Sequence, residues 1–422
     1  MGKGKGCRTD HASPPTLTSP HAVSFPDAQR LFVDGIHSSV QNHTLSDGLP
    51  EMRIVVAMDS FKGSLTAAEA CEAVASGLGR ALPEADLVLR PMADGGEGTA
   101  ATVMAAVGGE WDSCRVTGPL PGKEVDAGFV WLAARGPGAL VEMAAASGLT
   151  LLDAAERDPL RTTTFGTGEL LRAAAERGAR VLWLAVGGSA TVDGGVGAAT
   201  ALGWRFLDPS GAEIGLGGEA LCRIQDIVPP DEVDLPPMVV LCDVDNPLLG
   251  ERGAARIFGP QKGAGPDVVE RLEEGLCNLV ERVRSVLGLD LRGLQRAGAA
   301  GGLAAGAVAF MGAKLESGVD TLTDVIGLPD AVAGADWVIT GEGRFDRQSL
   351  AGKVVSGVAR VARESGACVA VLAGSVAPEV EAGSPGIDEI EAATPAGVDP
   401  GEAMAQGADL LAAAAARLAA RL

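Results

Sequence analysis

Short apolar runs alternate with helical segments along this chain, and most of the runs end in a glycine-containing loop. Apolar runs of this length are typical of strands that are buried on both faces of a parallel sheet. The clearest predicted strands lie at 53–58, 86–90, 181–186, 239–242, 337–340 and 368–373. Predicted helices lie at 65–82, 98–107, 196–202, 266–287, 299–310 and 354–364, with a final surface helix at 404–422. The pattern therefore predicts an α/β fold with helices on both faces of a parallel sheet.

The alternation is interrupted between residues 111 and 143, where β-rich segments follow one another with Gly-Pro turns. Strands without intervening helices favour a mixed sheet, so we expect a second domain inserted into the first. The first α/β domain is expected at 52–92 plus 290–422, and the inserted domain at 93–289. Residues 1–51 are polar and aperiodic, which indicates either a disordered extension or a mis-assigned start ahead of Met52.

Charge and composition exclude several classes of protein. The 422 residues carry a net charge of −21 at pH 7, and only 3% are aromatic, with no tyrosine. Nucleic-acid binding needs basic patches and stacking rings, so we expect no such partner. No apolar run reaches the ~18 residues of a membrane span, and no signal peptide is recognisable. Seven scattered cysteines without a C-x-x-C pair are typical of free thiols in a reducing compartment, so we expect a cytoplasmic protein.

All four histidines lie within the first fifty residues. If that stretch is not catalytic, then Ser-His-Asp triads, H-E-x-x-H zinc sites and Cys-His proteases are excluded. Phosphoryl transfer needs mainly positioning, positive charge, a metal ion and a carboxylate that orients the attacking hydroxyl. The loops supply such residues, although neither G-x-x-x-x-G-K-[ST] nor G-x-G-x-x-G occurs. The residues alone therefore indicate a kinase-like site of an unusual type.

Polar, glycine-rich loops follow four of the predicted strands directly. They are DSFKGS (59–64), GGSATVDGG (187–195), DVDN (243–246) and GEGRFD (341–346). In open α/β sheets, ligands bind beyond the carboxyl ends of the strands, where helix N-termini offer free N–H groups. We therefore expect these loops to form the functional site.

Each loop has a simpler interpretation as well. The GGSATVDGG loop fits a phosphate cradle better than a plain connector, because its glycines allow close backbone approach ahead of a helix. Lys62 is either a solvated charge or a ligand for phosphate or carboxylate. Asp243 and Asp245 either form Asx turns or hold Mg²⁺ with other loop carboxylates. Those other carboxylates are Asp94, Asp193 and Glu342. Arg161 and Lys262 are either anion ligands or surface decoration.

Seven motifs follow one another along residues 52–422. They are DSFKGSLTA (59–67), PMADGGEGT (91–99), GGSATVDGG (187–195), CDVDNPL (242–248), FGPQKGA (258–264), GAAGGLAAG (298–306) and GEGRFDRQSLAGK (341–353). In order and spacing they resemble the glycerate kinase type 1 family. The resemblance implies a flavodoxin/Rossmann-like domain, an inserted mixed domain similar to restriction-enzyme folds, and an active site in the cleft between them. It also implies ATP-dependent phosphorylation of D-glycerate, mostly to 2-phosphoglycerate, with ATP and Mg²⁺ as the cofactors.

The resemblance carries roles over to individual positions. Asp193 is the candidate for orienting or deprotonating the glycerate hydroxyl, and Lys62 for contacting a phosphate or the substrate carboxylate. The other substrate-binding candidates are Arg161, Lys262, Asp94 and Ser60. The nucleotide- or phosphate-binding candidates are Gly187, Gly188, Ser189, Gly341, Gly343 and Lys353. The metal candidates are Asp245 and Glu342.

One position departs from the family pattern, and several alternatives remain. Val192 stands where the family usually has Asn, so a hydrogen bond near the substrate is expected to be missing. Alternative functions are formation of 3-phosphoglycerate, phosphorylation of another small hydroxy acid, and a non-catalytic nucleotide- or metabolite-sensing module. We expect a monomer or homodimer with small-molecule partners only, without nucleic acid or membrane.

Overall fold

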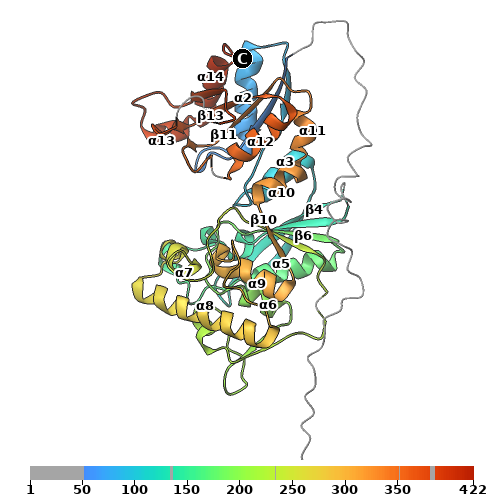
Figure 1. Ribbon diagram of the computed structural model, residues 1–422, viewed down its shortest axis with the longest axis vertical. Coiled ribbons are helices and arrows are strands. Elements are labelled where there is room, and N and C mark those ends of the chain that lie inside the picture. Colours follow the sequence, from blue (N-terminus) through green and yellow to red (C-terminus); the bar gives the residue numbers. More distant parts are fainter. Residues whose placement is uncertain (1–51, 134–135, 233, 351, 381–384) are drawn as a thin grey trace, which may run out of the picture.

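The protein consists of two lobes stacked along its longest axis (Figure 1). The computed structural model describes residues 52–133, 136–232, 234–350, 352–380 and 385–422, so the expectation for residues 1–51 lies outside the described residues. Each lobe is built around its own sheet, of five and six strands respectively. Within these ranges no helix has both the length and the apolar character needed to cross a membrane.

The first lobe contains an all-parallel five-stranded sheet. Its strands, in spatial order, are β15 (Glu389–Ala392), β13 (Cys368–Ala373), β11 (Trp337–Gly341), β1 (Arg53–Met58) and β2 (Asp86–Leu89). Numbered along the chain within this lobe, the order is 2-1-3-4-5, which is that of flavodoxin-like folds. The predicted parallel sheet is therefore confirmed.

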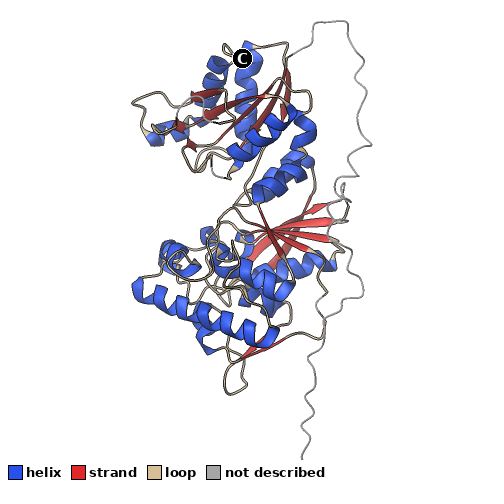
Figure 2. Ribbon diagram, in the orientation of Figure 1, coloured by secondary structure: helices blue, strands red, loops and turns tan. Residues whose placement is uncertain are grey.

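Helices cover both faces of this sheet (Figure 2). They are α2 (Ala67–Ala81), α11 (Leu328–Val332), α12 (Val354–Ser365) and α14 (Gly407–Leu418), while the short helix α13 (Pro400–Ala405) precedes α14 and has no buried residue. Alternate residues of β1 point to opposite faces, so Ile54 and Val56 pack against α2 and α14. Val55 and Ala57 pack on the side of α11 and α12. The predicted surface helix at the C-terminus thus has a buried face, which includes Leu411.

The second lobe contains a mixed six-stranded sheet. Its spatial order is β10 (Lys314–Glu316), β9 (Met238–Leu241), β6 (Val181–Ala185), β5 (Gly138–Glu142), β4 (Glu124–Leu132) and β3 (Glu110–Thr117). Strands β5, β6, β9 and β10 are parallel, whereas β3 and β4 are antiparallel additions. The β-rich stretch that interrupted the sequence pattern is this antiparallel part, so the predicted second α/β unit is confirmed.

The remaining elements of the second lobe pack mostly on one face of that sheet. Its helices are α4 (Ala144–Ser147), α5 (Phe165–Glu176), α6 (Val196–Ala201), α7 (Ala254–Phe258), α8 (Pro266–Leu287) and α9 (Leu303–Met311). Its short 3₁₀ helices are η2 (Leu149–Leu151), η3 (Ala154–Glu156), η4 (Gly218–Arg223), η5 (Pro260–Lys262) and η6 (Ala299–Gly302). Two short strand pairs complete the structure: β7 (Arg205–Leu207) with β8 (Asp226–Val228), and β12 (Arg344–Phe345) with β14 (Ser375–Val376).

Two helices lie between the sheets and join the lobes. They are α3 (Thr99–Val107) and α10 (Gly318–Ile326), which Figure 1 shows at the waist of the molecule. One apolar core contains Val103 of α3 and Leu322 of α10 together with Val55 of β1 and Leu140 of β5. The lobes are therefore connected by a continuous hydrophobic layer as well as by the chain.

The chain enters the second lobe through residues 91–98 and leaves it close to Ser317. We expected the return at residue 290, but β10 lies beyond that point and pairs with β9 of the six-stranded sheet. Helix α9 also belongs to the core of the second lobe, through residues such as Leu303 and Phe310. Strand β10 is only three residues long, and two of them are charged, so no apolar run indicated it. We accordingly propose the second boundary between β10 and α10.

Helix α2 begins two residues later than the sequence indicated. Ser64, the residue before the predicted start, does not cap the helix but donates its hydroxyl hydrogen to the carbonyl oxygen of Met404, at 2.7 Å. Thr66 is the actual N-cap, and it forms a capping box with Glu69. A capping box satisfies two otherwise unpaired donors, which explains why the helix begins after Thr66.

The glycine-rich segment 299–302 was predicted to begin a regular helix. In the structure it does not. Ala300 and Gly301 have left-handed backbones, with φ of 53° and 64°, and α9 begins only at Leu303. This bend lets Gly301 contact the loop at 187–195. A Cβ on Gly301 would lie 2.0 Å from the carbonyl oxygen of Thr191, so only glycine fits there.

Replacing Gly301 by Ala should destabilise the protein more than the same change at Gly312. Both glycines have φ near 65°, but no atom lies within 4 Å of a Cβ at Gly312. The backbone strain of about 1 kcal/mol is common to both variants. The overlap in Gly301→Ala should add about 1–3 kcal/mol. Urea unfolding midpoints would measure the difference, and equal losses would contradict the tight contact.

Candidate active site

The carboxyl ends of β1 and β11 form the switch point of the five-stranded sheet. The chain leaves β1 toward β2 on one side and reaches β11 on the other, which opens a crevice where ligands bind in such sheets. Asp59 directly follows β1, and its N–H donates to the carbonyl oxygen of Gly341 at 2.9 Å. Glu342 directly follows β11, and Lys62 lies exposed three residues beyond Asp59. The structure thus brings two of the predicted loops together.

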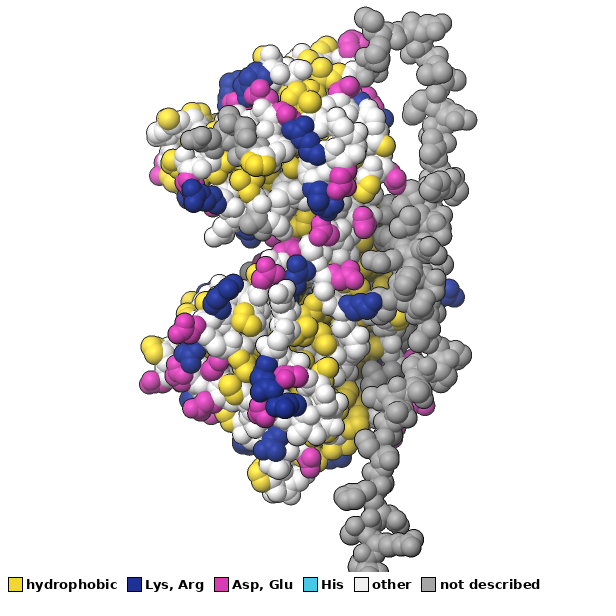
Figure 3. Space-filling view, viewed as in Figure 1, with side chains coloured by type: hydrophobic (Ala, Val, Ile, Leu, Met, Phe, Trp, Pro, Cys, Tyr) yellow, Lys and Arg dark blue, Asp and Glu magenta, His cyan; other side chains and the backbone are white. Residues whose placement is uncertain are grey.

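The segment 91–98 connects this edge to the second lobe. Met92 donates its N–H to the carbonyl oxygen of Met58 at the end of β1, at 2.9 Å. Gly95 accepts the N–H of Gly187, at 3.2 Å, and a Cβ on Gly95 would lie 3.1 Å from the end of β9 at Leu241. The carboxyl edges of both sheets therefore face the same segment, and the surface is hollowed between the lobes (Figure 3).

Acidic groups crowd the switch point. The pKa of Asp59 is raised to about 7, first because the carboxyl is buried and then because of the negative charge of Asp94, with a smaller contribution from Glu342. The N–H of Ser60, at 2.6 Å, and the charge of Lys62 oppose this rise. Burial also raises the pKa of Glu342. The carboxylates at the strand ends of the first lobe thus lie close together, and the nearby lysines do not fully offset their mutual repulsion and burial.

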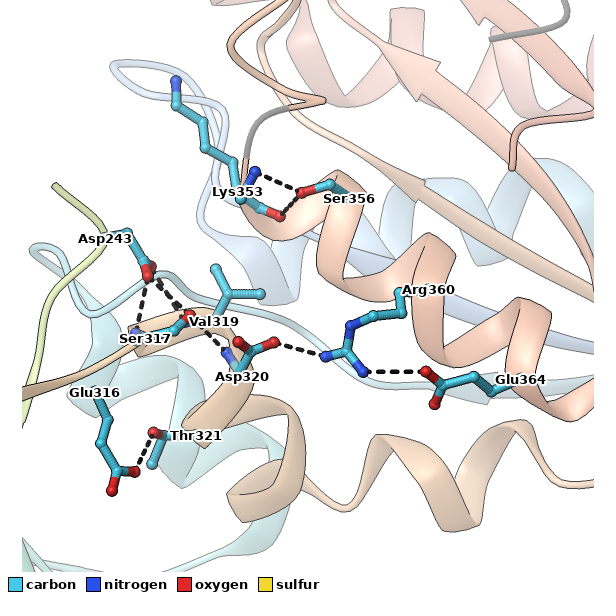
Figure 4. Close-up of polar contacts among 12 residues, drawn as sticks. Asp243, Glu316, Ser317, Val319, Asp320, Thr321, Lys353, Ser356, Arg360 and Glu364 are labelled. Carbon is cyan, nitrogen blue, oxygen red and sulfur yellow. Dashed lines mark hydrogen bonds and ion pairs between the residues drawn. The ribbon is translucent and has the colours of Figure 1, made fainter. Parts of the chain in front are cut away.

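Lys353 supplies a second cation at this edge. It is the N-cap residue of α12, and its carbonyl oxygen accepts the Ser356 hydroxyl at 2.8 Å. Its side chain extends away from α12 (Figure 4), and its charge helps to hold down the pKa of Glu342. Lys62 acts on Glu342 in the same way. Two lysines on different loops are therefore available to a polyanion at this edge.

The donor set suits a Mg²⁺ ion that arrives with phosphate oxygens. Among the described residues, no group of three or more His, Cys, Asp and Glu side chains forms a metal site by itself. However, the buried Oε1 atom of Glu342 has no hydrogen-bond partner among the described residues. Among the same residues, the Asp59 carboxylate accepts only the Ser60 N–H. Mg²⁺ keeps several waters and commonly takes only one or two carboxylates beside the phosphates. Asp59 and Glu342 therefore fit such an ion.

Asp245, the other predicted metal ligand, forms an ion pair in this structure. Its carboxylate is largely exposed and pairs with Arg296, with 3.4 Å between the nitrogen and oxygen. The largest charge effects on the pKa of Glu342 come from Lys353, Asp346 and Lys62. The metal pair of Asp245 and Glu342 therefore stays a prediction.

The glycine loop 187–195 lies on the opposite side of the segment 91–98. A Cβ on Gly187 would be 2.4 Å from Gly96, so this glycine is needed for close backbone contact. Gly188 is exposed, with φ of 72°. Ser189 is buried, and its hydroxyl accepts a hydrogen bond from the Lys262 ammonium at 2.7 Å. Within this loop, Gly188 is thus the residue of the predicted set that presents its backbone to solvent.

Lys262 stabilises this loop through hydrogen bonds from the interior of the second lobe. Its Nζ also donates to the carbonyl oxygen of Thr191, at 2.8 Å, and the side chain is fully buried. Burial lowers its pKa to about 7, against the opposing effect of the Asp193 carboxylate. Lys262 is therefore neither surface decoration nor open to a substrate carboxylate in this structure.

Asp193 is enclosed as well, with no exposed surface. Its carboxylate accepts the Thr164 N–H at 2.8 Å, the Thr164 hydroxyl at 2.9 Å, and the N–H groups of Gly195 and Gly197 at 3.1 and 3.3 Å. Burial raises its pKa, and these hydrogen bonds oppose the rise. The carboxylate orders the loop ahead of α6. A base must meet a substrate hydroxyl, and the enclosed carboxylate offers no surface for that contact.

The other predicted residues are divided between the two edges. Arg161 is exposed on the second lobe, and a Cβ on Gly217 would lie 3.1 Å from its Cα. Gly341 is required by packing, since its Cβ would lie 1.7 Å from the carbonyl oxygen of Leu372 on β13. Gly343 lies beside Phe61. The side chain of Val192 is buried in the core of the second lobe, so its effect on a hydrogen bond to the substrate stays a prediction.

Two residues that the structure places at these loops were not among the predicted site residues. Asp59 has a clear sequence signal, because it is the first polar residue after the apolar run at 54–58. Thr164, the main partner of Asp193, had none: one hydroxyl in the run Thr162–Thr164 cannot be told from its neighbours.

Comparison with known proteins identifies the family. A model described as the glycerate kinase family matches residues 54–422. The chain belongs to the glycerate kinase family. It is 45% identical to a glycerate 2-kinase of Escherichia coli over 335 residues, which cover 78% of this chain and 87% of that protein. It is 43% identical to a glycerate kinase of Halalkalibacterium halodurans over 370 residues, which cover 87% and 97%.

A solved structure also supports membership of the glycerate kinase family. A crystal structure from Salmonella typhimurium LT2, assigned as glycerate kinase 2, has a TM-score of 0.78 and 39% sequence identity. The similarity covers 88% of this chain and 98% of that one. The resemblance that the seven motifs predicted is therefore confirmed.

Replacing Asp59 by Asn should stabilise the metal-free protein at neutral and higher pH. At pH values between 3.8, the ordinary pKa, and about 7, Asp59 still holds its proton in the folded protein but has lost it in the unfolded chain. The wild type therefore loses stability as pH rises through this window, and the loss is complete above about 7. The Asp59→Asn variant has no such loss, and its side-chain oxygen can still accept the Ser60 N–H.

Melting temperatures in the presence of EDTA, measured across this pH range, would test the effect. The advantage of Asp59→Asn should grow with pH, whereas Asp231→Asn, at an exposed position, should show no trend. A constant difference between Asp59→Asn and the wild type would contradict the crowding of carboxylates at the switch point.

Proposed function

We propose that this glycerate kinase family member transfers the γ-phosphoryl group of ATP to D-glycerate and forms 2-phosphoglycerate. The observation that carries the proposal is the meeting of Lys62, Asp59 and Glu342 at the switch point, opposite the glycine loop of the second lobe. Family membership makes the chain a phosphotransferase, and the names of its relatives support glycerate as the acceptor. Both edges open toward Asp94, which lies on the segment between the lobes.

ATP is proposed to bind at the carboxyl edge of the five-stranded sheet. Lys62 and Lys353 would contact its phosphates, because ammonium groups on separate loops can hold different phosphate oxygens. Gly343 leaves room for the phosphates beside Phe61. Asp59 and Glu342 would hold Mg²⁺, which would neutralise the charge that develops on the transferring phosphoryl group.

Glycerate is proposed to bind on the facing edge of the second lobe. The exposed Gly188 backbone and the Arg161 guanidinium would contact its carboxylate. Lys262 and Asp193 would act indirectly, because Lys262 fixes Ser189 and Thr191 while Asp193 fixes the end of the same loop. Both are therefore proposed as positioning residues.

Asp94 is proposed to receive the hydroxyl proton of glycerate. Its carboxylate lies between the lobes and accepts the N–H of Gly96, at 2.9 Å. The hydroxyl oxygen would attack the γ-phosphorus while the proton passes to Asp94. The bond from the γ-phosphorus to the bridging oxygen would break, and ADP would leave with its electron pair. Positioning and electrostatic stabilisation account for most of the rate in such transfers.

Asparagine variants of Asp94 and Asp193 should separate the two roles. Asp94→Asn should lower kcat by ~10²–10⁴ without lowering the melting temperature, because a positioned base is lost while the crowding of carboxylates is relieved. Asp193→Asn would put an amide NH₂ among N–H donors and should cost about 1–3 kcal/mol of stability. Steady-state kinetics and thermal melting would measure both. A stable Asp193→Asn protein with a large loss of kcat would instead restore Asp193 as the base.

An ADP-release assay with D-glycerate and Mg-ATP tests the proposed function. The expected result is turnover that depends on D-glycerate, with 2-phosphoglycerate identified by phosphorus NMR. A 3-phosphoglycerate product, or turnover only with another hydroxy acid, would correct the regiochemistry or the acceptor. No turnover above a control without acceptor would favour a sensing module.

A cytoplasmic location and a monomeric or homodimeric state stay predictions. The six cysteines in the described ranges are all free thiols, which suits a reducing compartment. Small-molecule partners follow from the proposed reaction.

A further inference from the structure

The two crossings between the lobes meet at the carboxyl end of β9. The outgoing crossing carries Asp94, and the returning crossing carries Gly318 at the start of α10. A Cβ on Gly318 would lie 2.3 Å from the carbonyl oxygen of Asp94 and 3.0 Å from the carboxylate of Asp243. The returning chain is therefore in direct contact with both the proposed base and the strand end of the second lobe.

Asp243 binds the start of α10 through three hydrogen bonds. Its Oδ1 atom accepts the Ser317 hydroxyl at 3.0 Å and the Gly318 N–H at 2.9 Å, and its Oδ2 atom accepts the Val319 N–H at 3.1 Å. The first N–H groups of a helix have no partner within the helix, so an outside carboxylate can satisfy them. Figure 4 shows Asp243 reaching across to Ser317 and Val319.

Helix α10 is in turn attached to the first lobe. Asp320 pairs with Arg360 of α12, at 2.6 Å, and a Cβ on Gly357 of α12 would lie 2.3 Å from the Val319 side chain. Helix α12 covers the five-stranded sheet and begins just after Lys353. The contacts therefore run from β9 through Asp243 and α10 to α12 (Figure 4).

We propose that Asp243 is a positioning residue for phosphoryl transfer. It sets the separation between the glycine loop of the second lobe and the switch point of the first lobe. This inference rests on the proposed function. Asp243 follows β9, which pairs with β6, and the glycine loop follows β6. Helix α10 is packed against α12 of the first lobe. An acceptor hydroxyl and a phosphate bound on different lobes react only if this separation is correct. A misplacement of about 1 Å can lower the rate ~10²-fold.

Graded substitutions at Asp243 test the role. Asp243→Ala removes all three hydrogen bonds and should lower kcat by ~10–100-fold. Asp243→Asn keeps the acceptor for Ser317 and Gly318 and places its amide NH₂ against the Val319 N–H alone, so it should retain more activity than Asp243→Ala. Ser317→Ala, which keeps both backbone hydrogen bonds, should have the smallest effect and remains informative if Asp243→Ala does not fold.

The dissociation constants of the separate substrates distinguish positioning from direct contact. Calorimetry with D-glycerate alone and with a non-hydrolysable Mg-ATP analogue alone should give wild-type values within about twofold, because each ligand contacts mainly one lobe. Asp208→Ala is the matched control, since Asp208 also accepts three hydrogen bonds, from Ser210 and Ala212, within a turn of the second lobe. Its kcat should be unchanged.

Three outcomes would overturn the proposal. They are equal losses of kcat in Asp243→Asn and Asp243→Ala, a dissociation constant that rises in step with the loss of kcat, and wild-type kcat in Asp243→Ala. Small-angle X-ray scattering adds a readout that needs no turnover: Asp243→Ala should have a larger radius of gyration than Asp208→Ala. If the wild type does not phosphorylate glycerate, the proposed function fails, while the scattering result still tests whether Asp243 fixes the lobes.

Discussion

The close backbone contact along residues 91–98 is the constraint on which the arrangement of the site depends. This segment is bonded to the end of β1 through Met92 and to the glycine loop through Gly95. The approach of Gly96 to Gly187 leaves no room for a side chain on Gly187. The two sheets therefore present their carboxyl edges to each other, and every charged group proposed for catalysis lies on one of these edges or between them.

Much of the fold could be predicted because its signals are local. Helix α8 occurs where its apolar periodicity indicated, and the buried strands of both sheets are recognisable as apolar runs. Strand β10 and the left-handed turn at Ala300 could not be predicted, because both depend on tertiary contacts. A strand of three mostly polar residues forms only because β9 offers an unpaired edge.

The site could be predicted only in part, for a related reason. The sequence indicates which polar residues end a strand, as it does for Asp59 and Lys62, but not whether a side chain faces a ligand or the interior. Lys262 and Asp193 lie in loops of the same composition as the exposed ones, and both are buried. Such buried polar groups hold a loop in one conformation through hydrogen bonds. A motif therefore contains supporting residues as well as ligands.

The order of the strands has a consequence for synthesis on the ribosome. Strand β1 pairs with β2 soon after it emerges, but its other neighbour, β11, begins only at Trp337. The six-stranded sheet is complete at Glu316, before that partner exists. The inserted lobe can therefore fold first, while the apolar edge of β1 waits without a partner. Unpaired strand edges of this kind promote aggregation, so the early completion of the second lobe shortens the chain that still has to be ordered.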